Sequence, residues 1–214
     1  MDTAKIDITV ILPVILAIAA AELAMDAVAE ICQCSRMLLL GCVRLIEAGL
    51  IIAVLRIRKR DLDAIGLKWA ERGRGFTRGL LWSGGFGLLV LLAGFILFAA
   101  GINPLTLVRT PLPSTTGETF LFFAVGGLAA PLAEEFFFRG ILYGFFRRWG
   151  LAPALVLSTL CFVLAHTSSP GLPIPQITGG ILFALAYERE RNILVPVTIH
   201  ALGNWAIFAV SLLP

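Results

Sequence analysis

Residues 133–140, with the sequence AEEFFFRG, place three charged side chains inside one of the most apolar parts of the chain. Glu135 and Arg139 are four residues apart with the acid on the N-terminal side, which is the favourable order for an ion pair along a helix. Glu134 points about 100° away around the helix axis, so it cannot share that partner. We therefore predict one neutralised carboxylate and one, Glu134, that is left for chemistry.

The chain contains two histidines, and both lie in other apolar segments. Phe162 precedes His166 by one helical turn, and Asn204 follows His200 by one turn on the same helix face. At 1.5 Å of rise per residue, both histidines, Asn204 and Glu134 lie at similar depths, about 10 to 21 Å from one membrane surface. We therefore expect these four side chains to converge on one buried polar site.

A carboxylate, two imidazoles and an amide suit the hydrolysis of an amide bond. Burial disfavours the charged form of a carboxylate, which suits a general base that takes a proton from water and returns it to the leaving amine. An imidazole can hold that water, and an imidazole with an amide N–H can stabilise the oxyanion. No serine or cysteine nucleophile is required, so we expect a catalytic site rather than a structural cluster.

The elements that position these residues must be membrane helices. The chain has 214 residues, 58% hydrophobic and 14% charged, whereas soluble domains carry about 25% charged residues. Each crossing takes about 20 residues. We expect an all-α, polytopic transmembrane helix bundle of about seven spans, within a range of six to eight, with the site among the fourth, fifth and seventh. The expected spans are residues 8–29, 37–55, 80–100, 119–146, 152–166, 176–187 and 193–212.

The fifth and sixth expected spans are short, and two arrangements would accommodate them. Either they cross a locally thinned region with little tilt, or Pro170, Pro173 and Pro175 form a re-entrant connection between two broken helices. Such irregular backbone is tolerated in a membrane where protein or water satisfies it.

Basic residues predict the orientation of the bundle. The run from Arg56 to Arg60, which continues to Arg78, marks the loop after the second span as cytoplasmic. The N-terminus is then cytoplasmic and the C-terminus lies on the opposite side of the membrane, which is the cytoplasmic membrane if the source is bacterial. Residues 1–60 are expected to form an N-terminal transmembrane hairpin that ends in a basic cytoplasmic segment, and residues 61–214 the core that carries the site. These arginines are topology signals, so no nucleic-acid partner is expected.

Other polar residues in the spans have structural interpretations. Glu22, Asp26 and Glu30 recur every four residues and predict one acidic stripe on the first span, partly solvated rather than a proton path. Arg44 and Glu47, three residues apart in the second span, predict a structural ion pair.

Small residues predict close helix contacts. Gly127 and Ala130 lie on the Glu134 face and leave room for a substrate backbone or a neighbouring helix. Pro131 should kink the fourth span just before the two glutamates. Gly84 and its small neighbours in the third span predict helix packing there as well.

Three motifs now carry a family resemblance: E-E-x-x-x-R from Glu134, F-x-x-x-H from Phe162 and H-x-x-x-N from His200, in this order on separate apolar spans. Together with LDAIGLKW before the third span, they make the chain similar to the CAAX-protease and bacteriocin-processing (CPBP, or Abi) family of intramembrane proteases. Within that family it resembles the type II CAAX prenyl endopeptidases. The similarity covers roughly residues 60 to 210.

The resemblance implies an intramembrane endopeptidase that hydrolyses a peptide bond of a membrane-associated or lipidated protein or peptide. Glu134 would activate water, His166 would help hold it, and His200 with Asn204 would stabilise the oxyanion. The residues implied to support this site are Glu135, Arg139 and Phe162.

No cofactor is required for this chemistry, although zinc is an alternative. If a metal is present, Glu134, His166 and His200 are its expected ligands, because a carboxylate and two imidazoles are zinc donors. The H-E-x-x-H helix of zinc proteases is missing. Two other functions stay open: a non-catalytic membrane immunity or scaffold protein of the same fold, and a proton-coupled carrier, for which no inverted repeat is detected.

Overall fold

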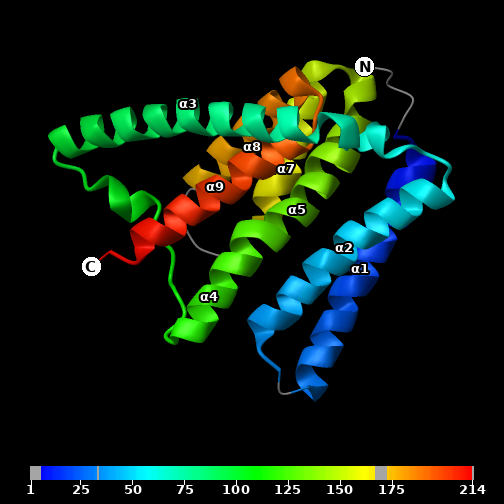
Figure 1. Cartoon of the computed structure of the whole chain (residues 1–214), viewed down its shortest axis with the longest axis horizontal. Coiled ribbons are helices and arrows are strands. Elements are labelled where there is room, and N and C mark those ends of the chain that lie inside the picture. The colour runs from blue at the N-terminus through cyan, green and yellow to red at the C-terminus, as the bar shows by residue number, and fades with distance from the viewer. Residues whose placement is uncertain (1–5, 33, 167–172, 214) are drawn as a thin grey trace.

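The computed structural model describes residues 6–32, 34–166 and 173–213, and within them it contains helices and connections but no β-strand. Figure 1 shows the helices as long rods, several of them side by side. The predicted all-α fold is confirmed. Along the described residues the long helices are α1 (Ile8–Ile31), α2 (Arg36–Ile57), α3 (Arg72–Ala99), α7 (Leu151–His166), α8 (Ile174–Glu190) and α9 (Leu194–Ser211).

The rod between α3 and α7 is composite. It consists of α4 (Thr116–Ala124), η4 (Val125–Ala129), α5 (Ala130–Glu135), η5 (Phe136–Tyr143), α6 (Gly144–Phe146) and η6 (Arg147–Trp149). We call these segments together the fourth rod. Short 3₁₀ turns occupy the connections on either side of α3, namely η1 (Leu62–Ile65), η2 (Trp69–Glu71) and η3 (Pro104–Leu107).

Five helical stretches of the described chain are long and apolar enough to cross a membrane. α7 is a shorter apolar helix and α8 has 17 residues, so the expectation of a short fifth and sixth rod is met. Pro173 precedes α8 and Pro175 lies in its first turn, whereas Pro170 falls outside the described residues. The polytopic helical bundle is therefore confirmed. The five stretches are Ile8–Ile31, Arg36–Ile57, Trp69–Ala99, Thr116–Trp149 and Leu194–Ser211.

The third helix shows why the bundle needs a bilayer. None of the residues in the most apolar 18-residue window of the α3 stretch is buried inside the protein. Leu88, Leu91 and Phe95 are 68%, 73% and 70% exposed. An apolar surface of this extent is unstable in water and stable against lipid chains. The chain is therefore an integral membrane protein.

The buried core lies where the fourth rod meets the connection before α3. Ile65, in the LDAIGLKW segment, and Ile141 are both 0% exposed. A Cβ added at Gly140 would lie 2.9 Å from the Ile65 Cβ, so the glycine of AEEFFFRG allows this segment to pack directly on the rod. The connection thus holds the rod at its end nearest to the glutamates.

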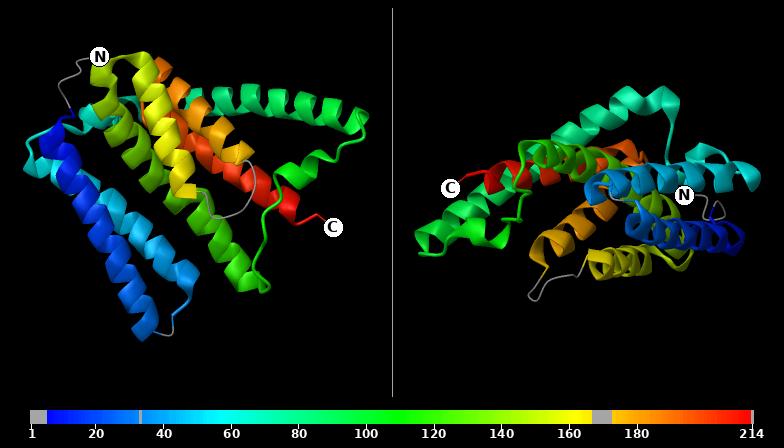
Figure 2. Two further views of the ribbon diagram at one scale, coloured as in Figure 1. Left: turned by 180° about the vertical axis from the view of Figure 1, so that it is seen from behind. Right: turned by 90° about the horizontal axis from the view of Figure 1, so that it is seen from below.

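The two N-terminal helices form a hairpin beside the fourth rod (Figure 2). α2 is the helix of the pair that contacts α5 and η4. A Cβ added at Gly41 would lie 2.7 Å from a Val125 methyl group, which shows how closely these helices approach. The expected division of the chain at residue 60 stays a prediction.

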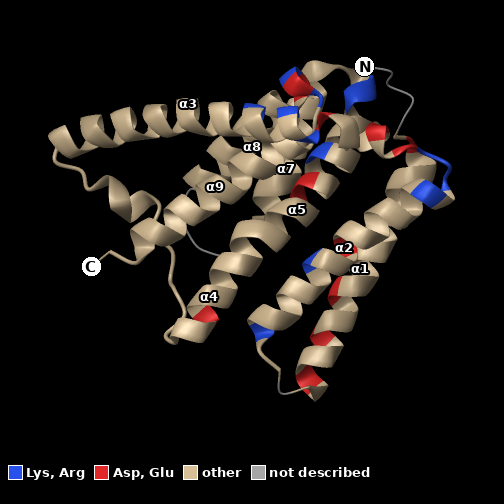
Figure 3. Cartoon of the chain, viewed as in Figure 1, with Lys and Arg blue, Asp and Glu red and all other residues tan. Residues whose placement is uncertain are grey.

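Lysines and arginines gather at one end of the bundle, where α2 ends and α3 begins (Figure 3). There Arg60 pairs with Asp7 at 2.6 Å, and Arg147 pairs with Glu188 at 3.1 Å. These pairs join helix ends that were all expected on one side of the membrane. Which side is cytoplasmic stays a prediction.

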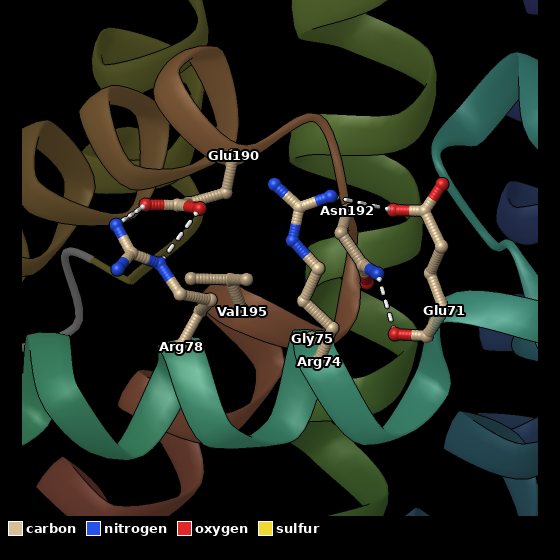
Figure 4. A pocket seen from close by; sticks show the side chains of 7 residues that line it. All are labelled: Glu71, Arg74, Gly75, Arg78, Glu190, Asn192 and Val195. Carbon is tan, nitrogen blue, oxygen red and sulfur yellow. Dashed lines mark hydrogen bonds and ion pairs between the residues drawn. The ribbon is translucent and has the colours of Figure 1, made fainter.

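A polar clamp at the same end fixes α3 across α8 and α9 (Figure 4). Arg78 donates to both carboxylate oxygens of Glu190 at 3.0 and 2.6 Å, and Asn192 donates to the backbone carbonyl of Glu71 at 3.2 Å. Gly75 lies directly under Asn192, where an added Cβ would meet the amide oxygen at 2.5 Å. The side chains of the clamp fill the space between these helices, so its role is to hold them together.

The glycines of α3 differ in how closely they pack against other elements. A Cβ added at Gly79 would lie 2.5 Å from the Thr198 Cβ, whereas no atom lies within 4 Å of one added at Gly84, Gly85 or Gly87. The expectation that these later glycines pack against another helix is therefore wrong for the described chain.

The contrast between Gly79 and Gly84 gives a matched test of the α3–α9 contact. We expect Gly79→Ala to lower the midpoint of thermal unfolding in detergent by several degrees, because overpacking costs about 1 to 3 kcal/mol. Gly84→Ala, on the exposed face of the same helix, should leave the midpoint unchanged or raise it, because alanine favours helix by about 1 kcal/mol. Equal midpoints for the two variants would contradict the described contact.

Candidate active site

The fourth rod is not a regular α-helix. Two π-helical segments, η4 and η5, flank the short α5 that carries both glutamates. The backbone N–H of Ala130 bonds to the carbonyl of Val125, five residues earlier, immediately before Pro131. Such a wide turn relieves the clash and the missing N–H that proline brings, and π turns are frequent at functional sites. The sequence predicted a break at Pro131 but not its π-helical form.

The predicted ion pair lies at the centre of the site. Arg139 donates to Glu135 Oε1 at 3.0 Å, and both side chains are 0% exposed. A second guanidinium nitrogen of Arg139 donates to the Gly180 carbonyl of α8 at 3.2 Å. The rings of Phe162 and Phe183 lie 4.5 and 5.1 Å from its guanidinium carbon, within the range of cation–π contacts. The buried charges are thus compensated by an anion, a carbonyl and aromatic faces.

His200 is oriented by this ion pair. Its Nδ1 lies 2.8 Å from Glu135 Oε1, and Phe183 stacks on the imidazole with the ring centroids 4.7 Å apart. Because the Glu135 carboxylate accepts a hydrogen bond, Nδ1 is the protonated nitrogen and a neutral ring presents a lone pair at Nε2. That Nε2 lies 3.8 Å from Glu134 Oε2.

The backbone of α7 orients His166 so that its Nε2, like that of His200, faces Glu134. Its Nδ1 lies 2.7 Å from the Phe162 carbonyl oxygen, which can only accept. Nδ1 therefore carries the proton, and Nε2, with its lone pair in the neutral ring, lies 3.3 Å from Glu134 Oε2. Phe162 packs against this histidine at a centroid distance of 4.4 Å, in the supporting position predicted for it.

Three hydrogen-bond acceptors consequently meet at Glu134. Its Oε2 is buried and accepts no hydrogen bond from the residues that the structure describes, and the Nε2 atoms of His166 and His200 both face it. Acceptors can share a site only through a proton, a water molecule or a cation. The side chains of Glu134 and His166 are 15% and 29% exposed, so the cluster is open on one side. This arrangement can bind a water molecule and remove its proton.

Asn204 stands apart from this cluster. It lies one turn after His200 on α9, and its side-chain amide donates to the Gly126 carbonyl of η4 at 2.7 Å. The structure therefore brings Glu134, His166 and His200 together and gives Asn204 a backbone partner on the fourth rod. The second N–H of its amide remains for another acceptor.

The room that the small residues of the fourth rod leave is filled by α9. A Cβ added at Gly127 would lie 1.8 Å from the indole nitrogen of Trp205, which donates to the Phe123 carbonyl at 3.0 Å. Of the two alternatives for this face, a neighbouring helix is the one observed.

A cavity of about 240 Å³ adjoins the cluster. The predicted Arg44–Glu47 ion pair is confirmed at 2.6 Å, but Arg44 also pairs with Glu22 at 2.6 Å, and all three residues line this cavity. Glu22 is 35% exposed, which agrees with the partly solvated stripe expected for it, and it also lines the cavity. Its lining residues are Ile18, Glu22, Arg44, Glu47, Ala133, Glu134, Phe137, Phe138, Ala165 and His166.

Phe183 and the Gly180 carbonyl were not found from the sequence. Neither lies in a motif of regularly spaced polar residues. A backbone carbonyl, moreover, cannot be identified from the type of its residue. The only available signal was the small pair Gly179 and Gly180, which predicts a close helix approach without naming the partner.

Metal binding has no independent support in this geometry. Among the described residues, no group of three or more His, Cys, Asp or Glu side chains meets the spacing of a metal site. Glu134, His166 and His200 are nevertheless the donor types that zinc takes. The predicted independence from a cofactor stays a prediction.

Fold and site together define a polytopic helical membrane protein with a buried glutamate–histidine centre. Residues 116–206 match the family described as type II CAAX prenyl endopeptidase Rce1-like. Over that segment the chain is similar to Rce1-like CAAX proteases, so the predicted family resemblance is confirmed. All the predicted site residues lie within it.

Two curated relatives support the same assignment. The membrane-embedded CAAX protease MroQ of Staphylococcus aureus (strain USA300) is 32% identical over 101 residues, which cover 44% of this chain and 40% of that protein. The UPF0177 protein YaiH of Lactococcus lactis subsp. lactis (strain IL1403) is 28% identical over 85 residues, 40% of this chain and 35% of that protein. The matches thus span less than half of either relative. No solved structure matches the chain.

The buried ion pair should be far more important for stability than exposed pairs of the same type. We expect Arg139→Ala to destabilise the protein by about 3 to 5 kcal/mol, because it leaves Glu135 as an uncompensated buried charge. Arg74→Ala is the matched control, since Arg74 is 68% exposed where it pairs with Glu71 and such pairs contribute about 0 to 1 kcal/mol. Unfolding in detergent, followed by circular dichroism, measures both. A similar loss in both variants would show that the Glu135–Arg139 pair is not the anchor.

Proposed function

We propose that this chain is an intramembrane endopeptidase that uses Glu134 to activate water. The proposal is carried by one observation, the convergence of the His166 and His200 Nε2 atoms on Glu134 Oε2, at 3.3 and 3.8 Å, beside a cavity. It is supported by the match of residues 116–206 to an Rce1-like family of CAAX endopeptidases.

The first step is the attack of water on the scissile carbonyl. A water molecule among the three acceptors donates one proton to Glu134 and the other to an imidazole, which leaves a lone pair of its oxygen for the carbonyl carbon. The C–O bond forms as Glu134 takes the proton. Glu134 then returns this proton to the leaving amine as the C–N bond breaks, which regenerates its carboxylate.

The second requirement is stabilisation of the oxyanion, which we assign to His200 and Asn204. Glu135 accepts from His200 Nδ1 at 2.8 Å and would stabilise the imidazolium form. His200 Nε2 would take a proton from solvent before the scissile carbonyl binds, donate this N–H to the oxyanion and keep the proton through the cycle. The remaining amide N–H of Asn204 lies one helical turn away on the same helix and would be the second donor. His166 holds the attacking water.

The substrate that fits this site is a membrane-associated or lipidated protein or peptide. The cavity is lined by Ile18, Phe137 and Phe138 as well as by the charged residues, and it lies among helices that face lipid. The cavity gives an extended peptide segment a route to Glu134, whereas the buried Glu135–Arg139 pair fills a neighbouring face of the fourth rod. We further propose the orientation with the N-terminus in the cytoplasm.

Glu134→Gln tests the general base. Glutamine keeps the size and the polarity of the side chain but cannot take a proton, so cleavage should fall by about 10²- to 10⁴-fold. The measurement is mass spectrometry of products from a library of lipidated and unlipidated peptides incubated with purified protein. Glu118→Gln, at an exposed position of α4 in the same rod, is the control and should cleave like the wild type.

Two outcomes would favour other functions. Equal cleavage by the wild type and Glu134→Gln would show that the detected activity does not use this site. Absence of cleavage by the wild type, with expression and unfolding midpoint unchanged in Glu134→Gln, would support a scaffold or immunity protein of this fold.

Chelation separates the water mechanism from a zinc mechanism. We expect activity to survive incubation with a strong chelator followed by removal of the chelator, because the three acceptors can act on water without a metal. Zinc content, measured by mass spectrometry before and after treatment, controls for incomplete removal. Activity that is lost with the metal and restored by zinc alone would assign Glu134, His166 and His200 as ligands instead.

A further inference from the structure

The cavity beside Glu134 has two walls of different origin. One wall comes from α5, η5 and α7, inside the segment that matches the protease family. The other comes from the α1–α2 hairpin, which supplies Ile18, Glu22, Arg44 and Glu47 and lies outside that segment. The hairpin thus contributes directly to the space that a substrate must occupy.

The hairpin wall carries more negative than positive charge. Arg44 donates to Glu47 and to Glu22, both at 2.6 Å, so two carboxylates share one guanidinium. Glu134, on the opposite wall, adds a further acidic group. Figure 3 shows further acidic positions along α1 beyond this cluster. A cavity that is lined by more negative than positive charge attracts a cation and repels an anion.

One oxygen of this cluster lacks a partner. Glu47 is 2% exposed, and its Oε2 accepts from Arg44, while its Oε1 is buried and has no hydrogen bond to any part of the chain that the structure describes. A buried acceptor without a donor is costly, and Glu47 lines the cavity. A donor that entered the cavity would satisfy this atom and balance the charge.

We propose that the α1–α2 hairpin forms a subsite for a positively charged group of the substrate, an ammonium or guanidinium that binds Glu47 and Glu22 close to the scissile bond. This inference rests on the proposed endopeptidase function. The apolar residues of the cavity, Ile18, Phe137 and Phe138, would contact the aliphatic stem of a lysine or arginine side chain. The preferred substrate is a peptide with a basic residue near the cleavage site.

Arg44 does not make this a carboxylate site. Both terminal nitrogens of its guanidinium already donate to acidic side chains. A substrate carboxylate would meet Glu22, Glu47 and Glu134 at the same time, and like charges in a low-dielectric cavity repel strongly. The role of Arg44 is to hold the two carboxylates of the hairpin in place.

Binding can be tested without catalysis. The purified full chain in detergent is heated with hexylammonium chloride, sodium hexanoate or hexanol, which share one apolar tail and differ in charge. We expect hexylammonium alone to raise the unfolding midpoint of the wild type. In Glu47→Gln its apparent affinity should fall about tenfold or more, because a charged acceptor is replaced by a neutral one.

Glu30→Gln is the matched control, since Glu30 is an exposed acid at the far end of the same hairpin and does not line the cavity. It should retain the full response to hexylammonium. If Glu47→Gln does not fold, Glu22→Gln replaces it, because this side chain is 35% exposed and its loss should be tolerated. An equal response to hexylammonium in all variants, or a midpoint raised by hexanoate instead, would overturn the subsite.

Cleavage of a peptide library then separates the two proposals. We expect the wild type to enrich lysine or arginine at one position near the cleaved bond, and Glu47→Gln to lose this enrichment by about tenfold while it still cleaves neutral peptides. Hexylammonium binding without any cleavage would contradict the endopeptidase and leave the subsite in place. Cleavage with no basic preference and no ammonium binding would remove the subsite and leave the endopeptidase.

Discussion

The buried pair of Glu135 and Arg139 is the interaction on which the rest of the site depends. Both side chains are fully buried, and a single ion in such surroundings would cost several kcal/mol. The pair also extends beyond its own helix, because Arg139 reaches the Gly180 carbonyl of α8 and Glu135 reaches His200 of α9. One ion pair thus fixes three of the helices that form the site. Burying the pair costs free energy of folding, and in return the pair fixes the positions of these helices and of His200.

The Glu135–Arg139 pair determines which nitrogen of His200 carries the proton. Glu135 accepts from His200 Nδ1 and so fixes the lone pair of that ring on the Glu134 side, and the Phe162 carbonyl does the same for His166. Two adjacent glutamates therefore have opposite roles although they are neighbours in the chain. One is neutralised by Arg139 and orients a histidine, and the other meets only acceptors. This separation follows from the 100° rotation between successive residues of α5.

The sequence allowed the fold class and most of the cluster to be predicted, because both depend on short-range spacing. A separation of four residues between Glu135 and Arg139 defines their contact once a helix is assumed, and equal depths bring the histidines to the same level. The π-helical segments were not predicted, since the residue pattern indicates a helix but not how many residues each of its turns contains. The bond between Asn204 and Gly126 depends on the crossing of two helices, which no local pattern records.

The α1–α2 hairpin contains a contact that short-range spacing in the sequence could not predict. Arg44 and Glu47 are three residues apart and were correctly paired, but Glu22 lies 22 residues away on another helix, and only the packing of α1 on α2 brings it to the same guanidinium. That packing brings one residue of the acidic stripe, Glu22, into the wall of the cavity. The segment with family similarity supplies the glutamate–histidine cluster, and the hairpin outside that segment supplies the facing wall of the cavity.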